Sequence, residues 1–347
     1  MQVEFRLARG QTFDFDILPF DACRPTGTQR LECGFLCGEP GGIVDLRLSA
    51  FLAVLNLTFC IYSIEKTVAE ALDGMAEALV LNHINADAGD HHFMLQVKRQ
   101  DQITFLHSEA LDRIPGVVHA FSTRRGERND FSLGPANSPN PMIQIHRARF
   151  VAAMGAPGWP IMKLKQVHSG VVVDIDDTSA ASEAVEGDAA VTSLRGMMLG
   201  VQTADCVPIL IADNEGGSAA AVHAGWRGTA ARIAASSIAR LVEKFRSDPK
   251  NLTAAIGPHI GVCCYEVGEE VVDAIPDPAS IERRPEWPKP HLNLAHANRQ
   301  QLLKAGIPGT QIEISSLCTK CREDLFHSFR RDGKRMGHLL SVIGLAL

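Results

Sequence analysis

The sequence predicts an α+β fold from about residue 102 to the end of the chain. Short apolar runs, of the length typical of buried strands, recur between residues 117 and 258. Longer stretches among them carry apolar residues at helical spacing. Strands and helices do not alternate one for one, so the pattern differs from that of a doubly wound parallel sheet.

Seven of the apolar runs are expected to be strands. Each is short and mainly apolar, which is typical of a strand buried inside a protein. Polar residues such as His, Cys and Asp interrupt several of them only near their ends. The expected strands span residues 117–123, 170–175, 187–193, 197–205, 207–213, 219–225 and 252–258.

Two helices are expected with clear boundaries. One spans residues 293–305 and ends before Gly306 and Pro308, because Gly favours a helix end and Pro does not continue a helix. The other spans residues 229–245, where the apolar residues recur at helical spacing. The apolar side of this second helix consists of Ile233, Ile238, Leu241, Val242 and Phe245.

The composition is that of a soluble globular protein, with 46% hydrophobic and 21% charged residues among 347. A chain of this length can bury a large core without disulfides. The net charge of −6 and the pI of about 6.1 provide no basic surface for a polyanion. Two Tyr and three Trp are also too few for a base-stacking surface, so nucleic acid is not an expected partner.

Four of the nine cysteines lie in the first 60 residues and five lie after residue 200. An odd number of cysteines in a long chain whose N-terminus lacks a signal-peptide pattern does not indicate a disulfide framework. A reducing, cytoplasmic location is therefore expected. The cysteines are Cys23, Cys33, Cys37, Cys60, Cys206, Cys263, Cys264, Cys318 and Cys321.

Residues 1–93 are expected to be an N-terminal extension of uncertain structure, or upstream sequence translated from a misplaced start. A polar break at residues 85–92 marks the boundary, and residues 94–347 form the expected catalytic domain. Apolar residues 48–64 are at the short limit for a membrane-spanning helix, so a buried strand or helix is favoured over an anchor. Residues 65–82 have the spacing of an amphipathic helix.

Two other patterns in this extension resemble metal sites only superficially. His91 and His92 lack accompanying Cys or carboxylate ligands, so a solvated loop is favoured. Cys33 and Cys37 lack the second cysteine pair of a zinc ribbon.

A His–Cys–His set marks the ends of three expected strands and carries the main functional hypothesis. His168, Cys206 and His223 are ligands of the kinds that zinc accepts, and three protein ligands with an open position are typical of a catalytic zinc. Such a metal would activate water as a nucleophile. Taken singly, each residue has an ordinary alternative: a strand Cys is usually a small core residue, and a His is often hydrogen bonded within the fold.

The residues flanking this set add candidates. Arg227, between Gly225 and Gly228, could clamp a phosphate or carboxylate at the start of a following helix, or it could cap its own loop on the surface. Asp205 could orient a ligand or transfer a proton. The Gly-rich run at 256–268 could line a pocket, although structural packing is favoured for Cys263 and Cys264.

Five motifs in order resemble those of one known family. This is the YfiH/YlmD family, also called the laccase-domain, multicopper polyphenol oxidase or peptidoglycan-editing-factor family, and the resemblance covers about residues 102–347. The motifs are KQVHS (165–169), TADCVPIL (203–210), HAGWRGT (223–229), IGPHIGVCCYEVG (256–268) and CREDLFHSFRRDGKRMGHLLSVIGL (321–345).

The resemblance implies a layered α/β/β/α domain with mixed sheets and a zinc held by His168, Cys206 and His223, with copper as an alternative metal. Members are described as purine nucleoside phosphorylases acting on adenosine, inosine and methylthioadenosine, with adenosine deaminase activity. A nucleoside and phosphate are thus the expected partners, and the oligomeric state is not predicted. The residues expected to act in catalysis are Cys206, Asp205 and Arg227, and those expected to bind substrate are Arg124, Gln166 and His259.

One segment departs from the family pattern. The family usually has a Gly-Gly turn after its Thr-Arg pair, but here Thr123 and Arg124 are followed by Arg-Gly-Glu. The helix expected at residues 143–154 also matches only loosely.

Other activities remain open. A copper-dependent polyphenol oxidase (laccase) is ranked lower, because three ligands are too few and the remaining histidines lack paired spacing. A peptidoglycan-editing hydrolase that clears mis-aminoacylated muropeptide precursors could use Cys206 or an activated water. A binding protein without catalysis would keep only the fold. The usual deaminase signature is absent, whereas phosphorolysis needs an anion site, for which Arg227 is the candidate.

Overall fold

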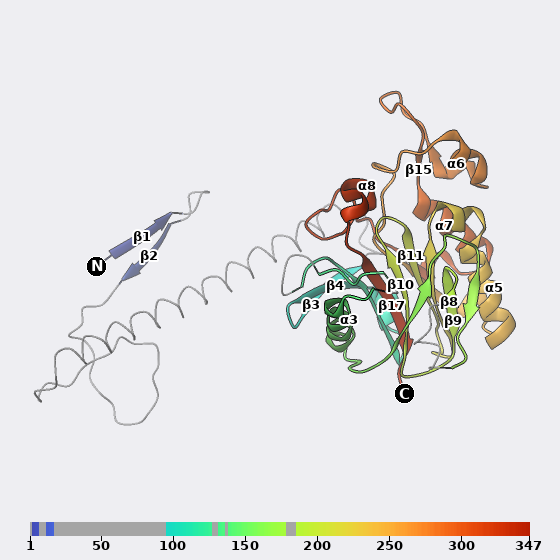
Figure 1. The fold of residues 1–347 in the computed structure, drawn as a ribbon, viewed down its shortest axis with the longest axis horizontal. Helices are drawn as coiled ribbons and strands as arrows, with labels where there is room; N and C mark the ends of the chain where they lie inside the picture. The colour runs from blue at the N-terminus through green and yellow to red at the C-terminus, as the bar shows by residue number, and fades with distance from the viewer. Residues whose placement is uncertain (1, 7–11, 17–94, 127–130, 136–137, 178–184) are drawn as a thin grey trace, which may run out of the picture. The chain divides into compact units, whose positions relative to one another are not determined.

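The computed structural model describes residues 2–6, 12–16, 95–126, 131–135, 138–177 and 185–347 (Figure 1). The chain divides into two units, Met1–Val80 and Leu81–Leu347. In the first unit, β1 (Gln2–Arg6) and β2 (Thr12–Asp16) pair as an antiparallel hairpin. The predictions for residues 48–64 and 65–82, for the break at 85–92, and for Cys33, Cys37, His91 and His92 lie outside the described residues.

The second unit contains a mixed seven-stranded sheet. β6 runs parallel to its two neighbours, β10 and β8, and the other neighbours are antiparallel. The order is β3 (Gln96–Gln100), β4 (Ile103–His107), β5 (Val117–Ser122), β17 (Leu339–Leu345), β10 (Met198–Thr203), β6 (Ile161–Lys165) and β8 (Val185–Glu186).

A mixed six-stranded sheet lies against the first. Its two outermost pairs, β16 with β13 and β7 with β9, are parallel, and the central pairs are antiparallel. The order is β16 (Ile312–Ile314), β13 (Leu252–Ile256), β11 (Val207–Asp213), β12 (Ala219–Ala224), β9 (Ala189–Thr192) and β7 (Val172–Asp174). A separate short pair consists of β14 (Ile281–Glu282) and β15 (His291–Leu292).

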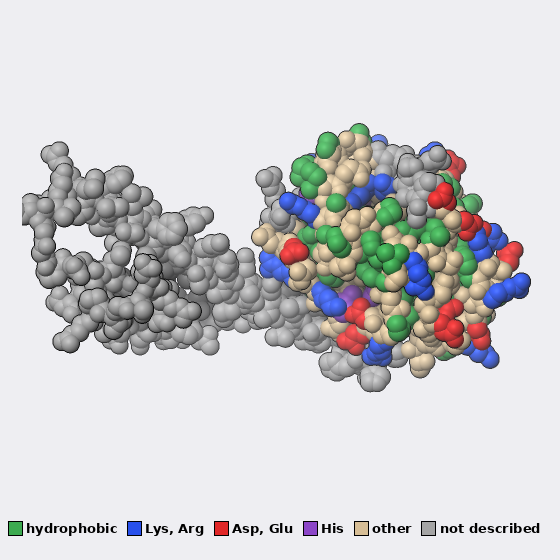
Figure 2. All heavy atoms as spheres, turned by 90° about the horizontal axis from the view of Figure 1, so that it is seen from below, with side chains coloured by type: hydrophobic (Ala, Val, Ile, Leu, Met, Phe, Trp, Pro, Cys, Tyr) green, Lys and Arg blue, Asp and Glu red, His purple; other side chains and the backbone are tan. Residues whose placement is uncertain are grey.

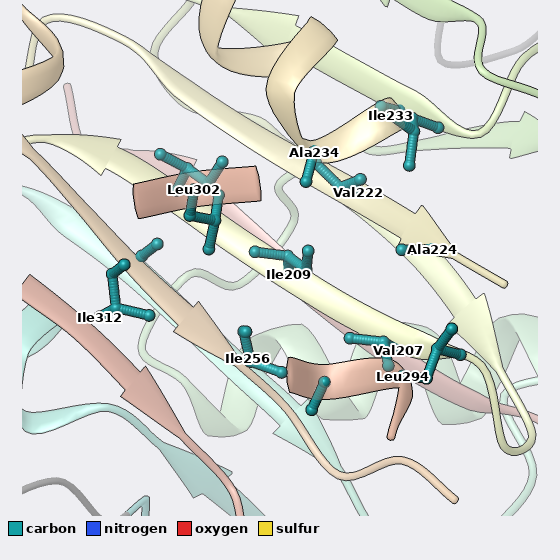
Figure 3. Close-up of a cluster of buried hydrophobic side chains, with 14 of the residues drawn as sticks. Val207, Ile209, Val222, Ala224, Ile233, Ala234, Ile256, Leu294, Leu302 and Ile312 are labelled. Atoms are coloured by element: carbon teal, nitrogen blue, oxygen red, sulfur yellow. The ribbon is translucent and has the colours of Figure 1, made fainter. Parts of the chain in front are cut away.

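Helices cover the outer faces of both sheets, which gives the layered α/β/β/α order (Figure 1). On the six-stranded sheet, buried Val207 and Ile209 of β11 belong to one apolar cluster with residues of α5 (Ile233–Phe245) and α7 (Leu294–Lys304), as Figure 3 shows. On the seven-stranded sheet, Phe150 of α3 (Pro141–Ala153) packs in a second cluster. The inner faces meet where β10 and β17 contact β11 and β12.

The remaining helices are short. They lie in the connections between the longer elements. They are α2 (Glu109–Asp112), α4 (Trp226–Ala230), α6 (Glu269–Ala274), α8 (Phe329–Asp332), and the 3-10 turns η3 (Pro249–Asn251), η4 (Pro278–Ser280), η5 (Gly309–Gln311) and η6 (Gly333–Arg335).

The expected α+β class, all seven expected strands and the helix at 293–305 are confirmed. The single helix expected at 229–245 is wrong, because α4 ends and α5 begins around Arg232, whose φ of 62° is left-handed. At the break, the Thr229 carbonyl accepts hydrogen bonds from the Arg232 N–H at 3.0 Å and from Gln301 Nε2 at 2.7 Å. β17 was not among the expected strands, although it is central to its sheet.

Two surface and length properties of the described residues bear on possible partners of the chain. On the face drawn in Figure 2, Lys and Arg side chains lie dispersed among Asp and Glu. Among the described residues, no helix has both the length and the apolar character that crossing a bilayer requires.

Candidate active site

A cavity of about 590 Å³ lies beside the ends of strands from both sheets. Its walls come from segments that are far apart in the sequence, so only the folded chain assembles it. The largest contributions are from residues 164–168, 202–206, 223–227 and 329–338, with Pro135, Ile260, Tyr265 and Leu294 completing the lining.

The structure brings His168, Cys206 and His223 together in this cavity. One ligand atom from each lies within 4.8 Å of the others. The two imidazole rings are nearly perpendicular, at 80°, with centroids 4.9 Å apart. His168 is exposed, whereas His223 is buried on β12. We call these three residues the His–Cys–His trio.

Local backbone conformation places the trio. His168 follows β6 with a φ of 59°, and Asp205, which precedes Cys206, has a φ of 100°. Both are left-handed conformations that a side-chain-bearing residue adopts at a cost. Gly225 allows the approach on the other side, because a Cβ there would lie 3.0 Å from Cys206 Sγ and 3.1 Å from His168 Cδ2.

Asp188, at the start of the expected strand at 187–193, organises the trio and was not predicted. Its fully buried carboxylate faces His223 Nδ1 at 2.8 Å and accepts hydrogen bonds from the His168 and Ser169 backbone N–H groups at 3.0 and 2.6 Å. The Val167 N–H lies at 3.3 Å. Asp188 thus fixes the loop that carries His168 and orients His223, whose Nε2 is left to face the site.

The charges of these groups stabilise one another. Burial alone would raise the pKa of Cys206, but the positive charge of His223 and hydrogen bonds from both histidines lower it to about 6. Burial would lower the pKa of His223, but the Cys206 thiolate and Asp188 raise it to about 9. Burial would likewise raise the pKa of Asp188, yet hydrogen bonds from His223 and Ser169 hold it well below its usual range.

The trio fits a metal ion. Two imidazoles and an ionised thiolate are zinc or copper ligands, and a carboxylate on the second nitrogen of a ligating His is the usual partner in such sites. The trio offers three protein ligands and faces an open cavity. Three ligands with an open position are typical of a catalytic rather than a structural metal site.

Asp205 lies in the cavity wall with both carboxylate oxygens engaged. Oδ1 accepts a hydrogen bond from the Thr319 hydroxyl at 2.6 Å, and Oδ2 accepts one from the Arg330 backbone N–H at 2.7 Å. Its own carbonyl accepts one from Ile260 N–H at 2.9 Å. Asp205 therefore joins three separate loops beside Cys206.

Two arginines border the cavity. Arg227 lies in the first turn of α4, is exposed, and stacks on the Trp226 ring at 4.3 Å. Arg330, which the sequence analysis did not single out, lies over the Tyr265 ring at 4.9 Å and donates to the Glu266 carbonyl. The two guanidinium groups give this side of the cavity positive charge.

The three expected substrate-binding residues have different positions. Gln166 lines the cavity, but its amide exchanges two hydrogen bonds of 2.7 Å with the backbone of Gln202. The described cavity lining does not include Arg124 or His259. Arg124 donates to the Glu323 carbonyl, and buried His259 contacts the Gly257 carbonyl through Nδ1.

Comparisons with known proteins agree with this architecture. Residues 118–346 match the family model described as multi-copper polyphenol oxidoreductase laccase. A purine nucleoside phosphorylase of Bacteroides thetaiotaomicron is 41% identical over 253 residues, covering 68% of this chain and 94% of that protein. Adenosine deaminase RL5, from an unknown prokaryotic organism, is 36% identical over 263 residues, covering 68% and 97%. The crystal structure of YlmD from Geobacillus stearothermophilus superposes with a TM-score of 0.65 at 30% identity, covering 72% of this chain and 99% of that one.

Proposed function

The chain belongs to the multi-copper polyphenol oxidoreductase laccase family, and on that premise we propose that it is a zinc-dependent purine nucleoside phosphorylase that also deaminates adenosine. Relatives bearing these two enzyme names support an enzyme that processes nucleosides. The observation that carries the proposal is a cavity in which the His–Cys–His trio faces two arginines. Adenosine, inosine and methylthioadenosine are the proposed substrates.

Zinc is the metal we propose, with the trio as its ligands. His168, Cys206 and His223 supply two nitrogens and one thiolate, which is a donor set of catalytic zinc sites. When bound, zinc would polarise the reacting group and increase the nucleophilicity of water. Because the Cys206 thiolate and Asp188 raise the pKa of His223, we expect metal binding to displace a proton from this imidazole.

Arg227 and Arg330 are proposed to hold phosphate. Phosphorolysis requires a phosphate oxygen to attack the ribose carbon that carries the base, so the anion must be held next to the nucleoside. The two guanidinium groups border the cavity and match phosphate in charge and hydrogen-bond geometry. Apolar cavity residues Leu164, Ile260 and Leu294 offer a surface for a purine.

Asp205 is proposed to act mainly by position. Its two oxygens already accept hydrogen bonds from Thr319 and Arg330, so it holds the Cys206 loop against the segment that carries Arg330. Loss of this carboxylate should therefore change phosphate affinity as well as turnover. Gln166 has a similar supporting role, because its amide is bound to the Gln202 backbone.

Product analysis tests the proposal. Adenosine is incubated with the purified protein, with and without phosphate. Adenine and ribose 1-phosphate formed only with phosphate would support phosphorolysis, and inosine formed without phosphate would support deamination. If neither product forms, turnover of a phenol would instead support the oxidase, and turnover of a mis-aminoacylated muropeptide would support the hydrolase.

Two matched pairs of variants connect the products to the site. Cys206→Ala should abolish both activities and reduce bound metal, whereas His296→Ala, on α7 outside the trio, should retain them.

Arg227→Ala should raise the KM for phosphate by about 10-fold or more, as expected for the loss of a charge-assisted hydrogen bond. Arg113→Ala removes an arginine that is 78% exposed and does not line the cavity, so it should have no effect.

A further inference from the structure

Four cysteines gather in a second cluster, which shares no residue with the trio. Cys263 and Cys264 come from the loop after β13, and Cys318 and Cys321 come from the loop after β16. All four sulfur atoms lie within 4.8 Å of one another. Structural packing was favoured for Cys263 and Cys264: half-buried Cys264 does pack against the core of the six-stranded sheet, whereas Cys263 is exposed.

The spacing of the sulfurs matches a tetrahedral metal site. With zinc–sulfur bonds of about 2.3 Å, the sulfurs of a tetrahedron lie about 3.8 Å apart. Cys321 Sγ lies 3.7 Å from Cys263 Sγ and 3.4 Å from Cys264 Sγ. All four cysteines are free, and these separations are well beyond the roughly 2.05 Å of a disulfide bond.

The surrounding backbone is adapted to sulfur ligands. The Gly261 N–H donates to Cys318 Sγ at 3.2 Å, which favours a thiolate. A Cβ on Gly261 would lie 3.1 Å from Cys263 Sγ and 3.5 Å from Cys318 Sγ, so a glycine gives the sulfurs room. The Gly261 carbonyl also accepts a hydrogen bond from Cys264 N–H at 2.9 Å, which turns the loop toward the cluster.

We propose that Cys263, Cys264, Cys318 and Cys321 bind a zinc-class metal ion as a closed tetrathiolate site. Four soft thiolates with no open position form a structural zinc site, in contrast to the three ligands of the trio. Cys318-x-x-Cys321 has the short ligand spacing that is common in such sites, and the adjacent Cys263 and Cys264 supply the second half from another loop.

The site would connect a loop of the cavity wall to a second loop that hydrogen bonds to Asp205. The first loop contributes Ile260 and Tyr265 to the cavity. The second loop carries buried Thr319, whose hydroxyl donates to Asp205 and whose N–H donates to the His259 carbonyl. A metal held between the loops would therefore stabilise the position of Asp205 without contacting substrate.

Metal counting on the full chain tests the site. Zinc bound per chain should be about two in the wild type. The double variant Cys318→Ser/Cys321→Ser should lose about one equivalent and retain zinc at the trio, whereas Cys206→Ala should lose the other equivalent. Because the two losses are independent, failure of the tetrathiolate site is distinguishable from failure of the proposed activity. Unchanged zinc content in the double variant would overturn the proposal.

Cobalt spectroscopy provides a second measurement, which does not depend on how well the double variant folds. Cys206→Ala is loaded with cobalt(II) in place of zinc, so that the signal from the trio is reduced. Intense ligand-field and thiolate charge-transfer bands of a tetrahedral cobalt tetrathiolate are expected. Their absence, or a Cys264–Cys321 disulfide detected by mass spectrometry in protein purified under reducing conditions, would refute the site.

Discussion

At the scale of single residues, Asp188 connects two members of the trio. One carboxylate orients the imidazole of His223 and fixes the backbone of the loop that carries His168. Outer partners of metal ligands commonly alter metal affinity by 10- to 100-fold when they are changed. The geometry of the site therefore depends on a residue outside the trio.

Asp188→Asn should weaken zinc binding by about 10- to 100-fold. The amide has only one acceptor oxygen, so it cannot accept the hydrogen bonds from both His223 and the 167–169 backbone. The substitution also removes the negative charge that raises the pKa of His223. Zinc affinity is measured by competition with a chelator. Asp213→Asn, at the end of β11 and outside the cavity lining, is the control and should leave the affinity unchanged. Equal affinities in both variants would contradict the assigned role.

Gly225→Ala should disturb the trio by crowding. The new Cβ would lie 3.0 Å from Cys206 Sγ and 3.1 Å from His168 Cδ2, so these side chains must move. Overpacking of this kind costs about 1–3 kcal/mol, and lower zinc affinity should accompany the lower stability. Gly217→Ala is the matched control, because nothing lies within 4 Å of its Cβ. Urea unfolding measures the stability of both variants, and competition with a chelator measures their zinc affinity. Equal values for the two variants would contradict the crowding.

At the scale of elements, the α4–α5 break matters most for the site. It lets α4 carry Trp226 and Arg227 to the cavity while α5 covers the sheet. The break is held from α7, where Asn298 Nδ2 donates to Thr229 Oγ1 at 2.9 Å and Gln301 donates to the Thr229 carbonyl. Helical periodicity across 229–245 is continuous, so no local pattern revealed it.

Asn298→Ala should reduce stability by about 1–3 kcal/mol. Asn298 is fully buried, and its amide donates hydrogen bonds to the Thr229 hydroxyl and to the Leu294 carbonyl. The substitution removes both bonds. Because α4 is anchored through Thr229, the KM for phosphate should also rise. Urea unfolding and steady-state kinetics measure these effects. Gln300→Ala, partly exposed on the same helix, should change neither by a comparable amount.

An ion cluster joins β7 to α5 and predicts a pH dependence. Arg240 and Lys244 contact Asp174, and the hydrogen bond from Arg240 lowers the pKa of Asp174 to about 2. A carboxyl whose pKa is lowered on folding adds stability that is complete above its unfolded pKa of about 3.9 and lost as pH falls through 2. Between pH 4 and 2, wild type should therefore lose stability faster than Asp174→Asn.

Urea midpoints at several pH values measure that difference. Asp176→Asn serves as the control, because Asp176 is more exposed and contacts only Lys244 of the same pair. Parallel pH profiles for wild type and Asp174→Asn would show that the ion cluster contributes nothing to folding.

At the scale of the whole molecule, both sheets and the cavity lie within residues 94–347. Every strand of the two large sheets and every residue that lines the cavity falls in this range. A chain beginning at Met94 should therefore fold with a similar Tm and keep the nucleoside activity of the full chain. Calorimetry and adenosine turnover test this expectation, and loss of folding or activity would assign residues 1–93 a necessary role.

Sequence patterns were sufficient for features that depend on local periodicity or on residue identity. Apolar runs located the seven expected strands because each buried strand is apolar over its own length. The His–Cys–His trio was recognisable from polar residues that interrupt apolar strand ends, and the family motifs because each is a run of consecutive residues. Strands and motifs are local in sequence, whereas the members of the trio are far apart in the chain and were picked out by residue type.

The tertiary structure alone decided which distant residues meet. Asp188 joins His168 and His223 because β9 pairs with β7 and β12, an order that no local pattern contains. The same holds for the four cysteines, whose two pairs are brought together because β13 and β16 run parallel side by side. Sheet order depends on the summed packing of whole layers, and it therefore determined the outer partners of the trio and the second cluster, which the sequence by itself left undetermined.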